Sequence, residues 1–221
     1  ILLVHHSMGF DCFEKIIGLP DKKVLIYHNI TPERFFEDEG IKKYIRKGLA
    51  QLKEYKNHVV YSIADSNYNR KDMIRQGYDK VDVMPVQVSL NRFDDLEIVK
   101  EIKEKYQSST NILFVGRVVQ NKCQDDLIKC FSLYAKYFDA DSHLFLAGDL
   151  GMEGYVAQLK ELCREREVED KVLFLGKVSE RELKTYYELA DIFLSMSEHE
   201  GFGVPLLEAM KAGVPVVAYS S

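Results

Sequence analysis

Short apolar runs, rich in β-branched residues, alternate along the chain with longer segments in which apolar positions recur every three or four residues. The first pattern predicts buried strands and the second predicts helices with one apolar face. The expected strands are 1–4, 23–27, 58–63, 80–84, 111–115, 142–147, 171–174, 191–195 and 214–218. The expected helices are 10–18, 32–38, 41–55, 68–76, 123–138, 153–167, 179–189 and 204–212.

This alternation predicts parallel sheets with helices packed on both faces. The rhythm breaks over residues 86–110, where a polar stretch and a highly charged helical segment precede the next apolar run. We therefore predict two α/β domains, a first domain with its linker over 1–108 and a second over 109–221. Both ends of the chain stand inside apolar runs, so we expect the chain to be an excerpt in which both domains are incomplete.

Composition narrows the class of protein. The 221 residues are 46% hydrophobic and 29% charged, which is ordinary for a globular protein, and the net charge of −5 comes without a basic stripe. We therefore expect no nucleic-acid partner. No apolar run reaches the roughly 18 residues that a membrane span needs. Four cysteines without CxxC or zinc spacing favour reduced thiols in a cytoplasmic protein.

The stretch from Glu200 to Glu208 carries the strongest chemical signal. It follows an expected strand and opens an expected helix, and its glycines let a ligand approach the backbone closely. The first amides of a helix favour a phosphate, and the two carboxylates suit hydroxyl-rich rings on either side of it. This combination indicates a nucleotide-sugar, although a strand–loop–helix with capping acids explains the same pattern about equally well.

Two further patterns stand at expected strand ends. Arg117 follows the first strand of the second domain and Lys122 lies five residues on, so both cations suit a diphosphate without a metal. The alternative is a pair of surface cations without a role. His5 and His6 follow the first strand and are suited to hydrogen-bond a sugar or shuttle a proton, although a buried or capping histidine is commoner.

Several other classes of enzyme lack their motifs. The sequence has no GxGxxG after a strand, no GxxxxGK[ST] phosphate loop, no HExxH zinc motif and no GxSxG nucleophile elbow.

The residues Gly116-Arg117 with Lys122, the run Glu200-Gly-Phe-Gly-Val-Pro-Leu-Leu-Glu208 and Gly213-Val-Pro-Val-Val217 together resemble the family 4 retaining glycosyltransferases. The resemblance covers 109–221 closely and 1–108 more loosely. It implies an α/β fold with two Rossmann-like parallel-sheet domains that face each other across a cleft, the GT-B architecture. That family's N-terminal glycine-rich loop would lie before Ile1, and we expect this excerpt alone to be inactive.

The resemblance also implies roles for individual residues. Arg117 and Lys122 would hold the donor diphosphate, Glu200 would contact the donor sugar, and Glu208 would bind the ribose. His6 is the favoured cleft histidine of the first domain, with His5 as the alternative. The remaining implied substrate-binding residues are Gly116, Phe202, Gly203, Val204, Leu206 and Leu207, with Asn29 and Ser66 as weaker candidates.

The expected activity is transfer of a hexose from a UDP- or GDP-sugar to a hydroxyl of a glycan or lipid-linked acceptor, with retained anomeric configuration. It would serve glycan or polysaccharide biosynthesis and need no metal or other cofactor. The alternatives are a sugar-nucleotide epimerase, a phosphorylase, or a non-catalytic protein that binds sugar-nucleotides. We expect a cytoplasmic location, with peripheral association at the inner face of the membrane as an alternative, and the oligomeric state is open.

Overall fold

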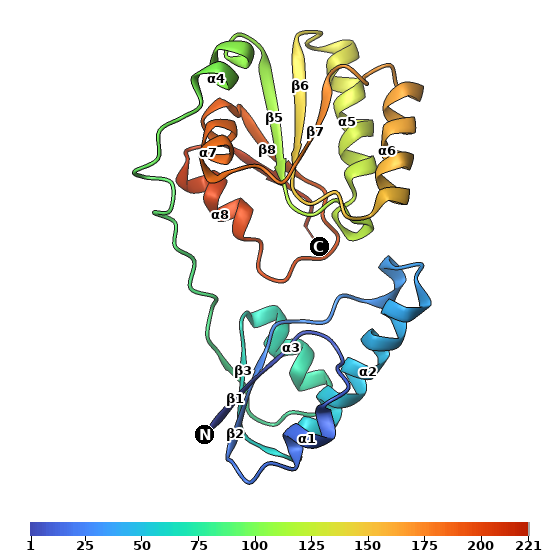
Figure 1. Cartoon of the computed structure of the whole chain (residues 1–221), viewed down its shortest axis with the longest axis vertical. Helices are drawn as coiled ribbons and strands as arrows, with labels where there is room; N and C mark the ends of the chain where they lie inside the picture. The colour runs from blue at the N-terminus through green and yellow to red at the C-terminus, as the bar shows by residue number, and fades with distance from the viewer. Residues whose placement is uncertain (221) are drawn as a thin grey trace. The chain divides into compact units, whose positions relative to one another are not determined.

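A computed structural model describes residues 1–220 of the chain. The chain divides into two compact units, Ile1–Gln87 and the part from Val88 onward. Each unit contains one sheet in which all the paired strands run parallel, with helices packed against it (Figure 1). The predicted α/β fold class is therefore confirmed.

Unit 1 contains a four-stranded sheet in the order β1-β2-β3-β4. Consecutive strands are neighbours, so the residues that follow β1, β2 and β3 lie along one edge of the sheet. Its elements are β1 (Leu2–His6), α1 (Phe13–Ile17), β2 (Lys23–Tyr27), the 3-10 helix η1 (Glu33–Phe35), α2 (Glu39–Tyr55), β3 (Val59–Ala64), α3 (Asn67–Arg75) and β4 (Asp82–Val83).

All three α-helices of unit 1 contribute to a single apolar core. Phe13 of α1, Leu52 of α2 and Met73 of α3 pack in one cluster with Leu25 of β2. Helix α2 begins where Asp38 accepts a hydrogen bond from the amide of Ile41 at 2.9 Å. The amphipathic face predicted for 41–55 is thus the face that covers the sheet.

Two predicted elements of unit 1 differ from the structure. The helix expected over 32–38 is only the 3-10 helix η1, because Pro32 has an extended ψ of 141° and no side chain caps the helix start. The strand expected over 80–84 is reduced to β4, which pairs only with Ile63 and Ala64 of β3. A short element leaves little periodicity in the sequence, so its bounds are hard to predict.

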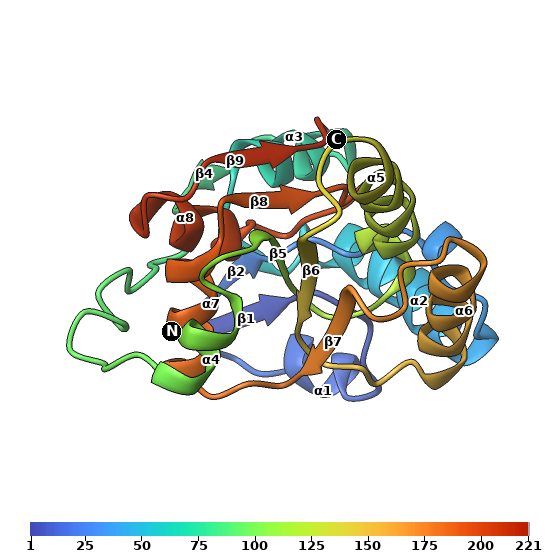
Figure 2. The ribbon, with the colours of Figure 1, turned by 90° about the horizontal axis from the view of Figure 1, so that it is seen from above.

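Unit 2 contains a five-stranded parallel sheet in the order β7-β6-β5-β8-β9. The chain moves outward from β5 to β7 and then returns to the other side of β5, so β5 and β8 are neighbours (Figure 2). The elements are α4 (Lys100–Tyr106), β5 (Thr110–Val115), the 3-10 helix η2 (Gln120–Lys122), α5 (Gln124–Tyr137), β6 (Ser142–Ala147), α6 (Glu153–Glu165), β7 (Val172–Gly176), α7 (Glu180–Leu189), β8 (Ile192–Ser195), α8 (Val204–Lys211) and β9 (Val216–Ala218).

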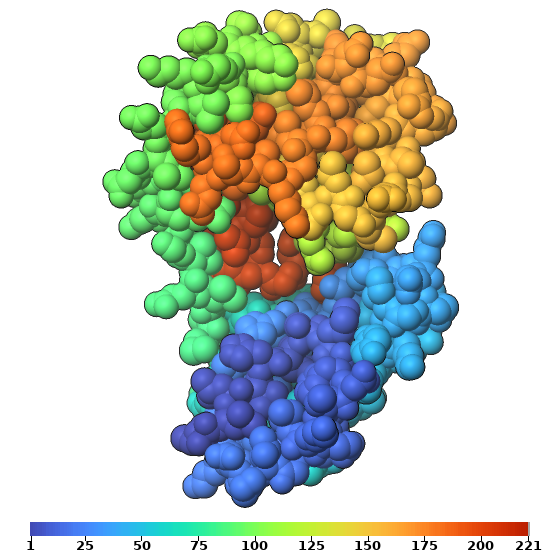
Figure 3. Space-filling model, viewed as in Figure 1, coloured from blue at the N-terminus to red at the C-terminus, as the bar shows by residue number. Residues whose placement is uncertain are grey.

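Both faces of this second sheet are covered. Phe114 of β5 packs with residues of α5 and α6 on one face, whereas Leu113 of β5 packs with α4, α7 and α8 on the other. Alternate strand residues point to opposite faces, which explains why the strands read as continuous apolar runs. The polar side of α6, gold in Figure 3, forms part of the surface of unit 2.

The boundary between the two units falls after Gln87, earlier in the chain than the boundary predicted between 108 and 109. The charged segment packs as α4 against α7, and Tyr106 is buried in the core of unit 2. Thr185 Oγ1 also accepts a hydrogen bond from the amide of Val99 at 2.8 Å. The polar residues of this segment lie on its exposed side. Their number explains why we predicted that the segment is a linker of the first domain, although it packs in unit 2.

Candidate functional site

The carboxyl edge of the unit 2 sheet brings the two strongest sequence motifs into contact. Lys122 Nζ lies 2.5 Å from Glu200 Oε2 and donates a hydrogen bond to the carbonyl of His199 at 3.1 Å. Asn121 forms two further hydrogen bonds with the same loop. Its side-chain amide donates to the His199 carbonyl at 3.0 Å, and its backbone carbonyl accepts from the Glu198 amide at 3.0 Å. The 3-10 helix η2 therefore fixes the loop after β8.

Close packing of strand ends shapes the loop after β5. Gly148 has a φ of +148°, and a Cβ there would lie 1.9 Å from the carbonyl oxygen of Gly116. The exposed Arg117 follows directly, and its own carbonyl accepts a hydrogen bond from Gln124 Nε2 at 2.9 Å. The backbone of Arg117 is thus held in place, and no described residue forms an ion pair with its guanidinium.

Helix α8 begins without a capping side chain. Gly203 occupies the N-cap in the left-handed region (φ 82°, ψ 39°), and Pro205 stands in the first turn. Leu206 packs against the apolar core of unit 2, so its side chain is engaged in packing, whereas the first backbone amides of the helix have no capping side chain. Positive φ without a Cβ and uncapped amides are the conditions under which a helix start accepts an anion.

Glu208 is buried, with only 4% of the residue exposed, and both of its oxygens have protein partners. Tyr187 donates its hydroxyl proton to Oε2 at 2.9 Å, and the Arg92 guanidinium lies 2.8 Å from Oε1. Burial raises the pKa of Tyr187, and the charge of Glu208 raises it further, so the phenol stays protonated as a donor. Each carboxylate oxygen keeps a second lone pair, which can accept a bond from a ligand hydroxyl.

A cavity of about 440 Å³ opens beside this buried carboxylate. Its wall includes Phe93, Tyr187 and Lys211, the last residue of α8. The ring centroids of Phe93 and Tyr187 are 5.8 Å apart. The guanidinium of Arg92 stacks over the Phe93 ring at 4.4 Å. Sequence analysis identified Glu208 but neither Arg92 nor Tyr187, because these partners come from separate segments and carry no local motif.

In unit 1 the structure separates the two adjacent histidines. His6, the residue favoured from the resemblance, is 1% exposed, and its Nε2 lies 2.9 Å from the carbonyl of Gly48. Burial lowers the pKa of His6, so it stays neutral. His5 points the other way along the strand and is exposed. The structure therefore favours His5, the alternative, as the histidine that can reach a ligand.

The weaker candidates lie on the same edge of unit 1. Asn29 is buried in the left-handed region with a φ of 78°, and its side-chain nitrogen has no hydrogen-bond partner among the described residues. Ser66 caps α3, since its hydroxyl accepts a bond from the amide of Asn69 at 3.1 Å. The hydroxyl of Ser66 therefore has a structural role, whereas Asn29 keeps a donor available.

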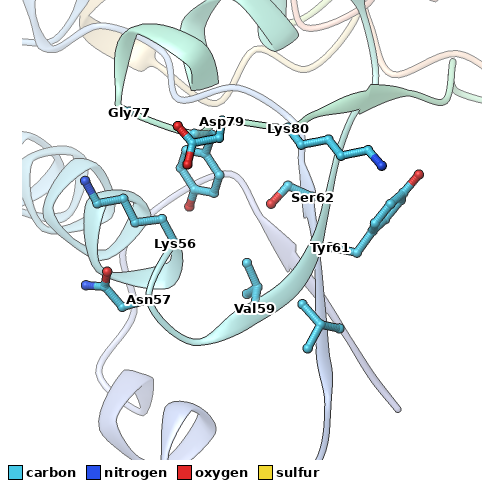
Figure 4. Close-up of a pocket in the computed structure, with 10 residues that line it drawn as sticks. Lys56, Asn57, Val59, Tyr61, Ser62, Gly77, Asp79 and Lys80 are labelled. Atoms are coloured by element: carbon cyan, nitrogen blue, oxygen red, sulfur yellow. The ribbon is translucent and has the colours of Figure 1, made fainter.

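A second cavity of about 370 Å³ lies at the opposite end of β3 and contains none of the predicted site residues (Figure 4). It exists because β4 pairs only with the last two residues of β3, which leaves one edge of 59–62 unpaired. Lys56, Tyr61, Asp79 and Lys80 surround it.

Within residues 1–220 the structure contains no cluster of three or more His, Cys, Asp or Glu side chains arranged for a metal ion. The same residues include no helix that is both long enough and apolar enough to cross a membrane.

Two parallel-sheet α/β units are the GT-B architecture of solved glycosyltransferases, such as one from Rickettsia africae that superposes with a TM-score of 0.72 at 20% identity. The family model described as "Glycosyl transferases group 1" matches residues 95–221, more than half of the chain. The chain belongs to this family.

Individual relatives agree with that assignment. The chain is 33% identical over 162 residues to mannosylfructose-phosphate synthase of Agrobacterium fabrum, which covers 70% of the chain and 34% of the relative. Sucrose-phosphate synthase from Thermosynechococcus elongatus superposes with a TM-score of 0.76 at 19% identity, over 98% of this chain and 55% of that one. HepE of Anabaena, solved with UDP and glucose, superposes with a TM-score of 0.69 at 21% identity, over 89% and 52%. The chain thus spans between a third and about half of these proteins.

Proposed function

We propose that the parent protein transfers a hexose from a UDP- or GDP-sugar to a hydroxyl of a glycan or lipid-linked acceptor, with retained anomeric configuration, in glycan biosynthesis. The observation that carries the proposal is the contact between Lys122 and Glu200, which joins the two motifs at one edge of unit 2. Lys122 and Arg117 supply positive charge for a diphosphate, and Glu200 presents a carboxylate to the hydroxyls of the attached sugar.

In the proposed reaction the bond between the anomeric carbon and the diphosphate oxygen breaks, and the acceptor oxygen bonds to the same face of that carbon. The acceptor proton passes to the departing diphosphate oxygen. Arg117, Lys122 and the first amides of α8 stabilise the charge that grows on this leaving group. These groups already provide the charge that a metal would supply, so we propose transfer without a metal.

Glu208 is the proposed ribose ligand. Its carboxylate is held by Tyr187 and Arg92, which fixes its direction before a ligand arrives. The uncapped start of α8 lies between Glu200 and Glu208 in the chain, so a phosphate there would have a hydroxyl-binding carboxylate on each side. HepE, whose structure was solved with UDP-glucose, is one relative of this fold that binds such a donor.

The test is a thermal-shift screen of the full-length protein against UDP-, GDP- and ADP-sugars, followed by product analysis with the stabilising donor. We expect stabilisation by one nucleotide class, a transferred sugar only when an acceptor is present, and unchanged turnover in EDTA. Conversion of the donor without any acceptor would instead indicate an epimerase, and binding without turnover under all conditions would indicate a non-catalytic protein.

A further inference from the structure

Three polar side chains of unit 1 form a series of contacts: His5 near the end of β1, His28 directly after β2, and Asp65 directly after β3. The carboxylate of Asp65 lies 3.4 Å from His28 Nδ1, and His28 Nε2 lies 2.7 Å from His5 Nδ1. The rings of His5 and His28 are parallel within 4°, with centroids 5.0 Å apart. Asp65 is buried and His5 is exposed, so this series of contacts runs from the interior of unit 1 to its surface.

At the buried end of this series of contacts, the donor and acceptor roles are set by Asp65. Asp65 accepts a hydrogen bond from the side-chain amide of Asn69, which is itself fully buried. His28 Nδ1 lies at an ion-pair distance from the Asp65 carboxylate, and negative charge beside this nitrogen favours the tautomer of His28 with its proton there. A neutral His28 then has its lone pair on Nε2, and the nitrogen of His5 that faces this lone pair must carry the proton.

The consequence appears at the surface. With its proton on Nδ1, His5 has a lone pair on Nε2, and no described residue forms a hydrogen bond with that nitrogen. His6, the next residue, is held in the opposite way, because its Nε2 faces the carbonyl of Gly48 and must donate. Two adjacent histidines therefore have opposite tautomers, each set by the group that faces it.

We propose that Asp65 and His28 are positioning residues that hold His5 with its proton on Nδ1, so that the exposed Nε2 accepts a hydrogen bond from a hydroxyl of the substrate. The substrate part rests on the proposed function, whereas the tautomer does not. Sugar donors and sugar acceptors both carry hydroxyls, and separate kinetics for the two substrates distinguish them.

The first experiment is nitrogen-15 NMR of the intact protein labelled at histidine, with each ring assigned by its loss in a His→Gln variant. Protonated and unprotonated ring nitrogens have well-separated resonances. We expect His5 to be protonated at Nδ1 and His6 at Nε2, so that His6 serves as an internal comparison. Protonation of His5 at Nε2 overturns the proposal. A doubly protonated His28 also overturns it, because His28 would then donate to His5 Nδ1 and the proton of His5 would lie on Nε2.

The discriminating variant is Asp65→Asn. Its oxygen can keep the bond from Asn69 while its amide group faces His28. The charge beside His28 Nδ1 is then replaced by a donor, which favours the proton of His28 on Nε2 and reverses the bond between His28 and His5. His5 should then be protonated at Nε2 while His6 is unchanged. An Asp-to-Asn change that produces the wrong histidine tautomer with intact geometry is a known effect in serine proteases. An unchanged His5 tautomer in folded Asp65→Asn would refute the positioning role.

Kinetics then test the hydroxyl contact. Asp65→Asn should raise the KM of one substrate, donor or acceptor, by about tenfold, the loss expected for one hydrogen bond, and leave the other KM unchanged. His58→Gln, a change of a histidine paired with Glu54 on the surface, is the control and should alter neither KM nor the His5 signals. Reversed tautomer with both KM values unchanged would overturn the hydroxyl contact. A wild-type protein without transfer activity would refute the proposed function and leave the tautomer assignment standing.

Discussion

The ammonium of Lys122 lies 2.5 Å from the carboxylate of Glu200, although the two residues come from motifs far apart in the sequence. The contact follows from the strand order, because β5 and β8 are neighbours and the loops that follow them share one edge of the sheet. Lys122 is only 13% exposed at its side chain, so solvent screens this pair less than an ordinary surface ion pair. The sheet topology therefore assembles a charged site from two separate loops.

Arg117 provides the first prediction. Its backbone is fixed by Gln124 while its guanidinium is exposed at the same edge, so Arg117→Ala removes charge from the proposed diphosphate site without removing a packing contact. We expect turnover to fall by about a hundredfold or more, as for loss of a group that stabilises transition-state charge. Arg166→Ala, at the exposed end of α6, is the control. Turnover within a factor of two of wild type in Arg117→Ala would exclude the assigned role.

Tyr187 provides the second prediction. Tyr187→Phe removes the hydroxyl that donates to Glu208 and leaves a buried carboxylate oxygen without that donor. We expect the free energy of unfolding to fall by about 1.5–3 kcal/mol, the range for hydrogen bonds to charged groups, in urea titrations followed by circular dichroism. Tyr186→Phe is the matched control, since its hydroxyl has no partner among the described residues, and should change stability by less than about 0.5 kcal/mol. Equal losses in the two variants would argue against the bond.

The third prediction compares two glycines of unit 2. Gly148→Ala places a Cβ 1.9 Å from the Gly116 carbonyl at a φ of +148°, so it should destabilise the protein by about 3 kcal/mol or more. Gly154 lies in the first turn of α6 with nothing within 4 Å of the added Cβ, and Gly154→Ala should stabilise by about 0.5 kcal/mol. Melting temperatures that move in the same direction for both would show that the strand ends are less closely packed than described.

His6 gives a pH prediction. Burial lowers its pKa below the 6.5 of an unfolded histidine, so below that pH the unfolded chain binds a proton that the folded chain does not. Folding stability should therefore be unaffected by His6 above about pH 7 and fall as pH drops below 6.5, by at most about 1.4 kcal/mol per pH unit. Hydrogen exchange of the β1 and β2 amides measures this opening free energy. The slope should shrink in His6→Gln but persist in His58→Gln, and an unchanged slope in His6→Gln would contradict the burial argument.

Much of the fold could be predicted because its elements are locally periodic. Helix α2 and strand β6 follow their predicted ranges within two residues, since each buries one regular set of apolar positions. The short strand β4 and the 3-10 helix η1 could not be defined, because two or three residues carry no period. The charged helix α4 was placed outside unit 2, since its contact with α7 depends on residues far along the chain.

The candidate site was predictable to the same degree. Motifs at strand ends identified Lys122 and Glu200, because topology alone brings such residues together. We predicted that His5 and His6 follow the first strand, whereas both lie within β1, where alternate residues face opposite sides, and the contact of His6 with Gly48 belongs to the buried side. The contacts of Arg92 and Tyr187 with Glu208 could not be predicted, because the partners of a buried carboxylate can come from any segment that packs against it.

Binding of a nucleoside diphosphate and of its sugar conjugate to two variants tests the central assignment most directly. Glu208→Gln should weaken both ligands by about tenfold or more, because both contain the ribose, as measured by calorimetry on the full-length protein. Glu200→Gln should weaken only the sugar conjugate by a similar factor, because only that ligand carries the hexose. Equal losses for both ligands in Glu200→Gln, or unchanged affinities in both variants, would contradict a donor site that runs from Glu200 to Glu208.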